Sequence, residues 1–205
     1  MRYEEYVKIL AHDYMESGIV DVDGYPDIDL YIDQMVKCLN KELRLYGDGE
    51  SGPVTKSMVS NYTKYKMIPR PAGKHYTKNH LILMTIVFYL KGCFSMEEIQ
   101  RLMKPVLDNY TSEWDEPIDL SSMYAEITDI IHRAEADLPE RMDAQIREIK
   151  RHLTKREAAD DDTSELMMLI TTLIMRSNAE RFIAEKLLDE YFAGVKKSTK
   201  NTKKK

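Results

Sequence analysis

The spacing of apolar residues constrains the fold of this chain more than any other feature of its sequence. Apolar side chains recur every three or four positions through most of the 205 residues, which is the period of an amphipathic helix. Alternation at period two, the pattern of a strand, occurs only in a short stretch at 69–76. The sequence therefore predicts an all-α fold with at most one small hairpin.

Local signals mark where the expected helices begin and end. Two helices are expected over 3–16 and 28–46, and two longer ones over 121–156 and 163–193. Between these pairs, three further helices are expected to begin after the capping residues Thr55, Thr77 and Ser95. Gly18 is expected to end the helix over 3–16. Ser95 and Glu98 have the spacing of a capping box, and Pro105 is expected to kink or end the helix that this box opens. Pro139 marks a break within 121–156.

The composition indicates a protein of the reducing cytosol. Cys38 and Cys93 are the two cysteines, and they form neither a CxxC pair nor a disulfide framework. The first ten residues carry acids within their apolar stretch, unlike a signal peptide. The longest apolar runs, 81–90 and 166–175, are far shorter than the roughly 18 residues of a membrane span. We therefore expect a cytoplasmic protein without a membrane segment.

Charge is segregated along the chain. A net charge of −5 would by itself disfavour a nucleic-acid partner, because an acidic surface repels phosphate. Between Glu50 and Glu97, however, the sequence has no acidic residue and seven lysine and arginine residues. This segregation marks 51–96 as a candidate polyanion-binding surface on an otherwise acidic protein.

Residues 54–103 hold a short helix with Lys and Asn on its outer face, a basic loop marked by prolines, an apolar helix and a capped helix. That order resembles the MerR-type DNA-binding domain. In that family a recognition helix ends in a tyrosine-rich stretch, two apolar residues and a proline follow, and a wing then ends in an aromatic residue. The matching places here are held by Asn61-Tyr62, Met67-Ile68-Pro69 and Tyr76, with Ser95, Met96, Glu98 and Ile99 resembling the start of a later helix. The resemblance implies a winged helix-turn-helix with additional N-terminal and C-terminal helices.

A closer resemblance is to a bacterial domain-of-unknown-function family, number eighteen thirty-six. Its members join a similar block to an upstream PDxDLYxDQ segment, which is here Pro26-Asp27-Ile28-Asp29-Leu30-Tyr31-Ile32-Asp33-Gln34. The match spans about 26–107 and implies a DNA-binding protein with no established activity.

The residue types in this region fit contacts with double-stranded DNA. Short polar side chains on a helix can reach base edges in a major groove, and basic side chains meet phosphates or a narrow minor groove. The predicted DNA-binding residues are Thr55, Lys56, Ser57, Ser60, Asn61, Tyr62, Lys64, Lys66, Arg70, Lys74, His75 and Tyr76. For Tyr62, Tyr65 and Tyr76, packing in the core is the competing expectation.

Two features depart from the MerR pattern. A loop at 47–53 replaces the tight turn that precedes the recognition helix in that family. Whether the helix over 28–46 packs against the recognition helix as its supporting helix depends on this loop. No long coiled-coil helix with metal-sensing cysteines follows, so an effector of that class is not implied, and the effector stays unknown.

We expect three regions. Residues 1–107 form the winged helix-turn-helix region with N-terminal helices, 108–195 a helical region for dimerisation or signal input, and 196–205 a disordered basic tail. The helix over 163–193 is apolar almost all round in its first half and must be covered on several sides, within the monomer or between two subunits. We favour a homodimer, because proteins that read half-sites usually pair.

Two alternatives to a DNA-binding regulator stay open. The first is a protein-interaction adaptor that uses the same winged scaffold without binding DNA. The second and weaker one is an enzyme, since the sequence holds no glycine-rich phosphate loop, nucleophile elbow or catalytic-triad spacing. The five histidines form no metal-binding spacing. We therefore predict no catalytic residue, no metal site and no cofactor.

Overall fold

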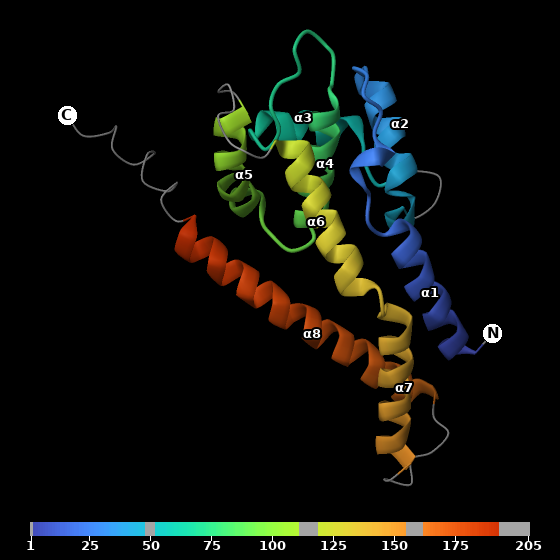
Figure 1. The fold of residues 1–205 in the computed structure, drawn as a ribbon. Helices are drawn as coiled ribbons and strands as arrows, with labels where there is room; N and C mark the ends of the chain where they lie inside the picture. The colour runs from blue at the N-terminus through green and yellow to red at the C-terminus, as the bar shows by residue number, and fades with distance from the viewer. Residues whose placement is uncertain (1, 48–51, 111–118, 155–161, 193–205) are drawn as a thin grey trace.

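The computed structural model describes residues 2–47, 52–110, 119–154 and 162–192, and this part of the chain is all-α (Figure 1). The helices are α1 (Tyr3–Ser17), α2 (Ile32–Glu42), α3 (Lys56–Lys64), α4 (Lys78–Leu90), α5 (Met96–Tyr110), α6 (Leu120–Glu135), α7 (Leu138–Thr154) and α8 (Asp162–Tyr191), with 3-10 turns η1 (Val22–Gly24) and η2 (Arg44–Tyr46). The expected all-α class is confirmed for these residues. Among the described helices, none combines the length and the apolar character that a membrane crossing requires.

The hairpin expected at 69–76 is reduced to a tight turn. Within the described ranges, bridge pairing is limited to two isolated bridges, Ala72 with His75 and Leu30 with Tyr76. Gly73 in the turn has a φ of 67°, a left-handed conformation that glycine adopts without steric cost. The loop at 65–76 is therefore a short projection between two helices and not a two-stranded ribbon.

The local signals for helix ends are confirmed. The N–H of Met58 donates to Thr55 Oγ1 at 3.2 Å. Ser95 and Glu98 form the expected capping box, in which the N–H of Ser95 donates to Glu98 Oε2 at 2.8 Å and the N–H of Glu98 donates to Ser95 Oγ at 3.3 Å. Gly18 follows the last residue of α1, and its N–H donates to the carbonyl of Tyr14 at 2.7 Å.

One of the expected boundaries is wrong. The helix over 28–46 is shorter, since α2 begins at Ile32, after the extended residue Leu30 that pairs with Tyr76. Pro105, expected to kink or end its helix, does not end α5, which continues to Tyr110. The break expected at Pro139 is confirmed, since α6 ends at Glu135 and α7 begins at Leu138. Pro139 is the second residue of α7, where a missing N–H costs no helical hydrogen bond. The basic tail expected at 196–205 lies outside the described residues.

Buried side chains form a large and a small core. The large core surrounds α4 and includes side chains of α2, α3, α5 and α6. The small core joins α1, α7 and α8 through Ile146, Ile149 and Leu169. Figure 1 shows α2, α3 and the loop after α3 at one end of the molecule and α7 at the other, with α8 running from α7 toward α5. The region predicted to contact DNA is thus built on the large core, away from α7.

Candidate nucleic-acid interface

Helix α3 has one buried face and one exposed face. Val59 and Tyr62 are buried in the large core, and Thr55 caps the first turn. The exposed residues are Lys56, Ser57, Ser60, Asn61 and Lys64. The nine residues of the helix thus present short polar and basic side chains to the surface, on the side opposite the core.

The loop after α3 is anchored to the segment that precedes α2. The N–H of Leu30 donates to the carbonyl of Tyr76 at 2.9 Å, and the N–H of Tyr76 donates back to Leu30 at 2.8 Å. The ring of His75 lies 4.8 Å from that of Tyr31, measured between centroids. The two separated sequence motifs therefore meet in space, and the position of the loop depends on both.

Lys66 has an unusual backbone conformation at the end of α3. Its φ is 55°, in the left-handed region that side chains other than glycine rarely adopt. The N–H of Lys66 donates to the carbonyl of Thr63 at 3.1 Å, and that of Met67 donates to Tyr62 at 2.9 Å. These two bonds form a Schellman motif, in which the left-handed residue is usually glycine. A lysine at this place costs roughly 1 kcal/mol or more in backbone strain.

Two lysines of the acid-free segment pair with the upstream acidic motif. Lys56 forms an ion pair with Asp33, and Lys78 forms one with Asp27 at 2.9 Å. The sequence did not indicate these pairs, because the residues come from different elements. Part of the positive charge of 51–96 is thus compensated within the molecule.

Four other cations of this segment have no such partner. We refer to these four as the basic cluster, and all are exposed: Lys64, Lys66, Arg70 and Lys74. Among the residues that the structure describes, no carboxylate lies within 4.0 Å of any of them. The seventh cation, Lys91, lies over the ring of Phe88 at 4.4 Å, at the far end of α4. The uncompensated charge is therefore concentrated on the end of α3 and the loop that follows.

Two predicted contact residues have little accessible surface. Tyr62 is 5% exposed and Tyr76 is 9% exposed, and burial raises the pKa of both phenols. Their rings pack in the large core, as the competing expectation held, so we exclude them from the contact surface. Tyr65, by contrast, is 49% exposed, and its carbonyl accepts a 2.7 Å hydrogen bond from Gln100 Nε2 of α5. The sequence offered no signal for that contact.

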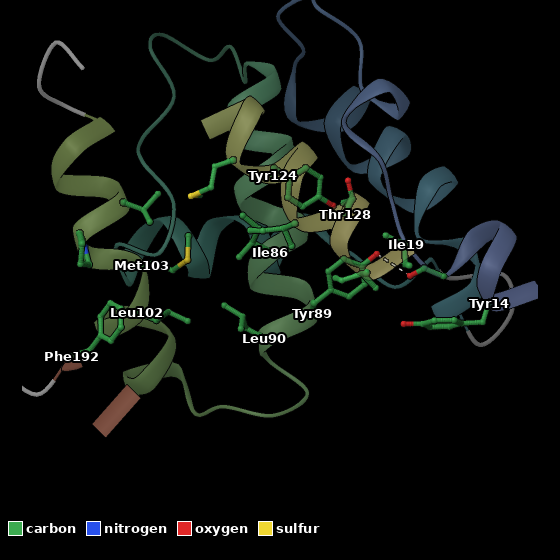
Figure 2. A pocket seen from close by; sticks show the side chains of 16 residues that line it. Tyr14, Ile19, Ile86, Tyr89, Leu90, Leu102, Met103, Tyr124, Thr128 and Phe192 are labelled. Atoms are coloured by element: carbon green, nitrogen blue, oxygen red, sulfur yellow. Dashed lines mark hydrogen bonds between the residues drawn. The ribbon is translucent and has the colours of Figure 1, made fainter. Parts of the chain in front are cut away.

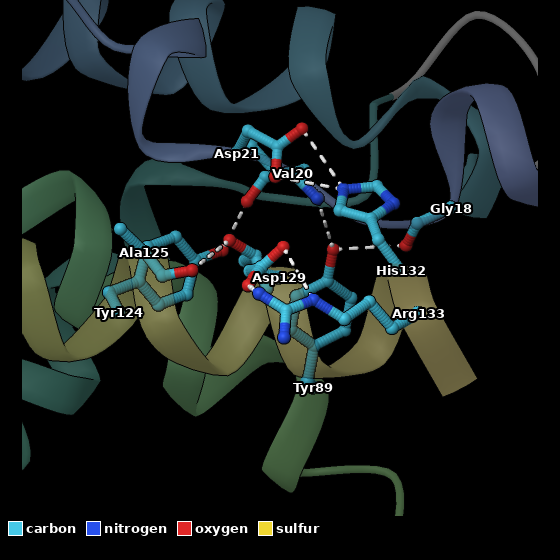
Figure 3. A network of polar contacts seen from close by, with 10 residues as sticks. Gly18, Val20, Asp21, Tyr89, Tyr124, Ala125, Asp129, His132 and Arg133 are labelled. Atoms are coloured by element: carbon cyan, nitrogen blue, oxygen red, sulfur yellow. Dashed lines mark hydrogen bonds and ion pairs between the residues drawn. The ribbon is translucent and has the colours of Figure 1, made fainter. Parts of the chain in front are cut away.

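A second polar network lies away from this surface, where α1 leads into η1 (Figure 3). The hydroxyl of Tyr89 accepts from the N–H of Val20 at 3.2 Å and donates to the carbonyl of Gly18 at 3.1 Å. The hydroxyl of Tyr124 donates to the carbonyl of Val20 at 2.5 Å. These hydroxyls hold the main chain of the connecting segment against α4 and α6, and burial raises the pKa of both. Their role is structural.

Within the four described ranges, no group of three or more His, Cys, Asp and Glu side chains is placed to hold a metal ion. In the same ranges, Cys38 is half-buried and Cys93 is exposed, and both are free thiols.

A comparison with protein-family models gives one match. The model described as Domain of unknown function (DUF1836) matches residues 20–127. Neither the curated proteins nor the solved structures contain a match to the chain. The matched residues include α2 to α5 and the first half of α6, and with them the large core and the basic cluster. Helices α7 and α8 lie outside the match.

Proposed function

The chain belongs to the family described as Domain of unknown function (DUF1836), and we propose that it binds double-stranded DNA as a transcriptional regulator. In this proposal α2 and α3 form a MerR-like helix-turn-helix, and the loop at 65–76 serves as a short wing. Helix α3 enters the major groove with its exposed face, and the wing lies along the flanking backbone.

The observation that carries the proposal is the basic cluster at the end of α3. Its four cations are exposed and uncompensated, and they continue the polar face that holds Ser57, Ser60 and Asn61. Phosphate contacts supply most of the affinity of a DNA-binding protein, and short polar side chains beside them supply base readout. An asparagine can bond an adenine with both atoms of its amide, so we assign base contact to Asn61.

The backbone of Lys66 adds an independent argument. Strained conformations of non-glycine residues persist where function needs the side chain and the surrounding structure holds it. Glycine would form the same Schellman motif without strain but would remove a positive charge from the basic cluster. The strain is consistent with a role for the lysine head group outside the fold.

We further propose that the protein is a homodimer and that α8 forms the interface. Eight large apolar side chains of α8 are between 52% and 76% exposed: Met167, Ile170, Ile174, Met175, Phe182, Ile183, Leu187 and Tyr191. Exposed apolar surface on this scale marks an interaction site. A second copy of the chain is a suitable occupant, because a pair of subunits would present two α3 helices to two half-sites.

The test of DNA binding is the salt dependence of affinity. Changing Lys64, Lys66, Arg70 and Lys74 to alanine should flatten the plot of log affinity against log salt by roughly 0.9 per lost contact, about 3 to 4 in total if all four meet phosphate. A matched control changes four exposed cations of other helices, Lys8, Arg133, Arg147 and Arg151, and removes the same charge. The control should keep nearly the wild-type slope.

A separate substitution tests base readout. Asn61→Ala should weaken binding to a sequence selected from a random pool by about 1–3 kcal/mol and leave nonspecific binding nearly unchanged. Circular dichroism should show that the quadruple variant is folded, since exposed lysines add little to stability. A folded quadruple variant with the affinity and salt slope of the wild type would contradict the DNA-facing assignment.

An adaptor is the second candidate, and one observation favours it. Large apolar side chains are exposed next to the basic cluster, with Ile28 at 65%, Tyr31 at 54% and Tyr65 at 49%. Exposed aromatic and aliphatic groups of this kind suit a protein partner better than a phosphate backbone. A wild-type protein that binds no duplex even at low salt would favour this candidate.

A further inference from the structure

An apolar pocket of about 630 Å³ lies away from the basic cluster, between α4, α5, α6 and the end of α8. Figure 2 shows Ile86 and Leu90 of α4 between its two sides, with Leu102, Met103 and Phe192 on one side and Tyr14 on the other. The volume falls within the range of about 300–1,000 Å³ that small-molecule sites occupy.

Among the described residues, those that line the pocket include no charged side chain. The hydroxyl hydrogens of three lining residues already go to main-chain carbonyls: Tyr89 donates to Gly18 at 3.1 Å, Tyr124 to Val20 at 2.5 Å, and Thr128 to Ala125 at 3.0 Å. These hydroxyls thus offer a ligand lone pairs only. The hydroxyl of Tyr14 also lines the pocket, but one neutral hydroxyl does not replace the hydration that a charged ligand would lose there.

The pocket is partly open to solvent, since the side chain of Ile127 in its lining is 41% exposed, so water in it would wet an almost wholly apolar surface. A hydrocarbon-rich ligand that replaced this water would gain the free energy of burying that apolar surface. Met103 and Met123 line the pocket, and methionine side chains adapt readily to the shape of a bound molecule. We infer that the pocket binds an uncharged, hydrocarbon-rich small molecule.

The place of the pocket gives such a ligand a structural role. Its walls come from α4, α5 and α6 of the matched domain and from Phe192, which directly follows α8. Close by, Arg101 of α5 is buried and forms an ion pair with Asp189 of α8 at 3.0 Å. A ligand in the pocket therefore contacts both the large core and the end of α8 and stabilises their contact. This inference is independent of whether the chain binds DNA.

The test uses the full-length protein with ¹³C-labelled methionine methyl groups and two probes of equal chain length, 1-decanol and sodium decanoate. Decanol should shift the methyl signals of Met103 and Met123 in a saturable way. The signals of Met167 and Met175, which are 67% and 66% exposed on α8, serve as the control and should not move. Decanoate should bind at least tenfold more weakly than decanol.

A variant that fills the pocket gives a second measurement. Val106→Trp should weaken decanol binding at least tenfold, and Ile170→Ser on the exposed face of α8 should not change it. Equal shifts at all four methionines, or the absence of saturation, would overturn the site. Equal binding of decanoate would overturn the ligand class. Should Val106→Trp not fold, the methyl shifts of the wild-type protein decide the matter alone.

Discussion

Helix α4 and the first half of α8 are both apolar on nearly every side, so both need cover from other parts of a protein. Helix α4 receives that cover from its own chain, since eight of its 13 residues are buried. Helix α8 has 30 residues, of which Glu165, Leu169 and Leu188 are buried. Met167, Ile170, Ile174 and Met175 in its first half are 58% to 67% exposed. The same pattern thus leads to a core helix in one place and to an open surface in the other.

An apolar pattern on all sides of a helix indicates that the helix must be covered. It does not indicate whether the same chain or a second molecule covers it. The helices that cover α4 lie in the stretch matched by the family model, on both sides of it in the chain. Helix α8 follows that stretch and contacts the chain mainly near its two ends, at Leu169 and Leu188. We expect a second subunit to cover the length between them.

The largest expected effect comes from matched truncations in the two helices. Leu83→Ala in α4 should lower the free energy of unfolding by about 2–5 kcal/mol, because Leu83 is fully buried and its loss leaves a cavity. Ile174→Ala in α8 removes a similar side chain that is 58% exposed, and should cost the monomer less than about 1 kcal/mol. Urea unfolding at a protein concentration below the dimer dissociation constant measures both. Equal losses would show that α8 is covered within the monomer.

The next effect concerns the proposed dimer. Ile170→Asp with Ile174→Asp places two charges on one exposed face of α8 and should weaken the dimer by at least about 2 kcal/mol, or roughly 30-fold. Light scattering across a dilution series gives the dissociation constant. The control, Ala134→Asp with Ala144→Asp, adds the same charge at exposed positions of α6 and α7 and should leave it unchanged. A wild-type protein that stays monomeric at high concentration would contradict the interface.

Features that depend on neighbouring residues were predictable from the sequence. The cap at Thr55, the capping box of Ser95 with Glu98 and the helix end at Gly18 involve residues at most four positions apart. The apolar spacing also identified the helices themselves and the all-α class. Such signals are local, so they can be recognised without knowledge of the tertiary fold.

Features that depend on distant residues were not predictable. The late start of α2 follows from the pairing of Leu30 with Tyr76, and the compensation of Lys56 follows from Asp33. Both bring the upstream motif against the α3 region, which no spacing in the sequence indicates. The Schellman motif at the end of α3 was not predictable either, because the usual signal for such a helix end is glycine and this chain has Lys66 there.

A third prediction concerns the small core, where α1 meets α7. Lys150 Nζ donates to Glu4 Oε1 at 2.6 Å. This hydrogen bond, together with a weaker contribution from the hydrogen bond of Arg2, lowers the pKa of Glu4 to about 2. The pKa of a glutamate in an unfolded chain is about 4.3. The stabilisation is therefore complete above about pH 5 and disappears as the pH falls toward 2. Glu4→Gln should cost about 1 kcal/mol or less at pH 7, since the pair is partly exposed.

Unfolding of the wild type and Glu4→Gln across this range gives the check. The difference between the two proteins should shrink as the pH falls from 5 to 2, because protonation of Glu4 removes the same interaction that the substitution removes. A difference that stays constant would show that Glu4 contributes by packing and not through its charge.

The smallest effect should appear at the start of α4, in the large core. His80 is 4% exposed, and burial lowers its pKa below the ordinary value, against an opposing effect from the charge of Asp29. The N–H of Thr77 donates to His80 Nδ1 at 3.1 Å, which also requires that nitrogen to be unprotonated. Folding thus favours the neutral form of His80. Above about pH 6.5, the pKa of an unfolded histidine, this group does not change the stability of the protein. Below that pH the stability decreases, because the unfolded chain takes up the proton first.

His80→Gln isolates this effect, because glutamine at the third helical position also completes a capping box with Thr77 and does not titrate. Between pH 7 and pH 5 the wild type should lose more stability than the variant, by less than the Glu4 pair contributes. Helix α8 contains no histidine, so the dimer should keep its dissociation constant in the same interval. The two helices are then distinguished by acid as well as by burial, since protonation acts on the core that covers α4 and leaves the face of α8 as it was. Parallel pH profiles for the wild type and His80→Gln would mean that water reaches His80 and that the start of α4 is less well covered than its burial indicates.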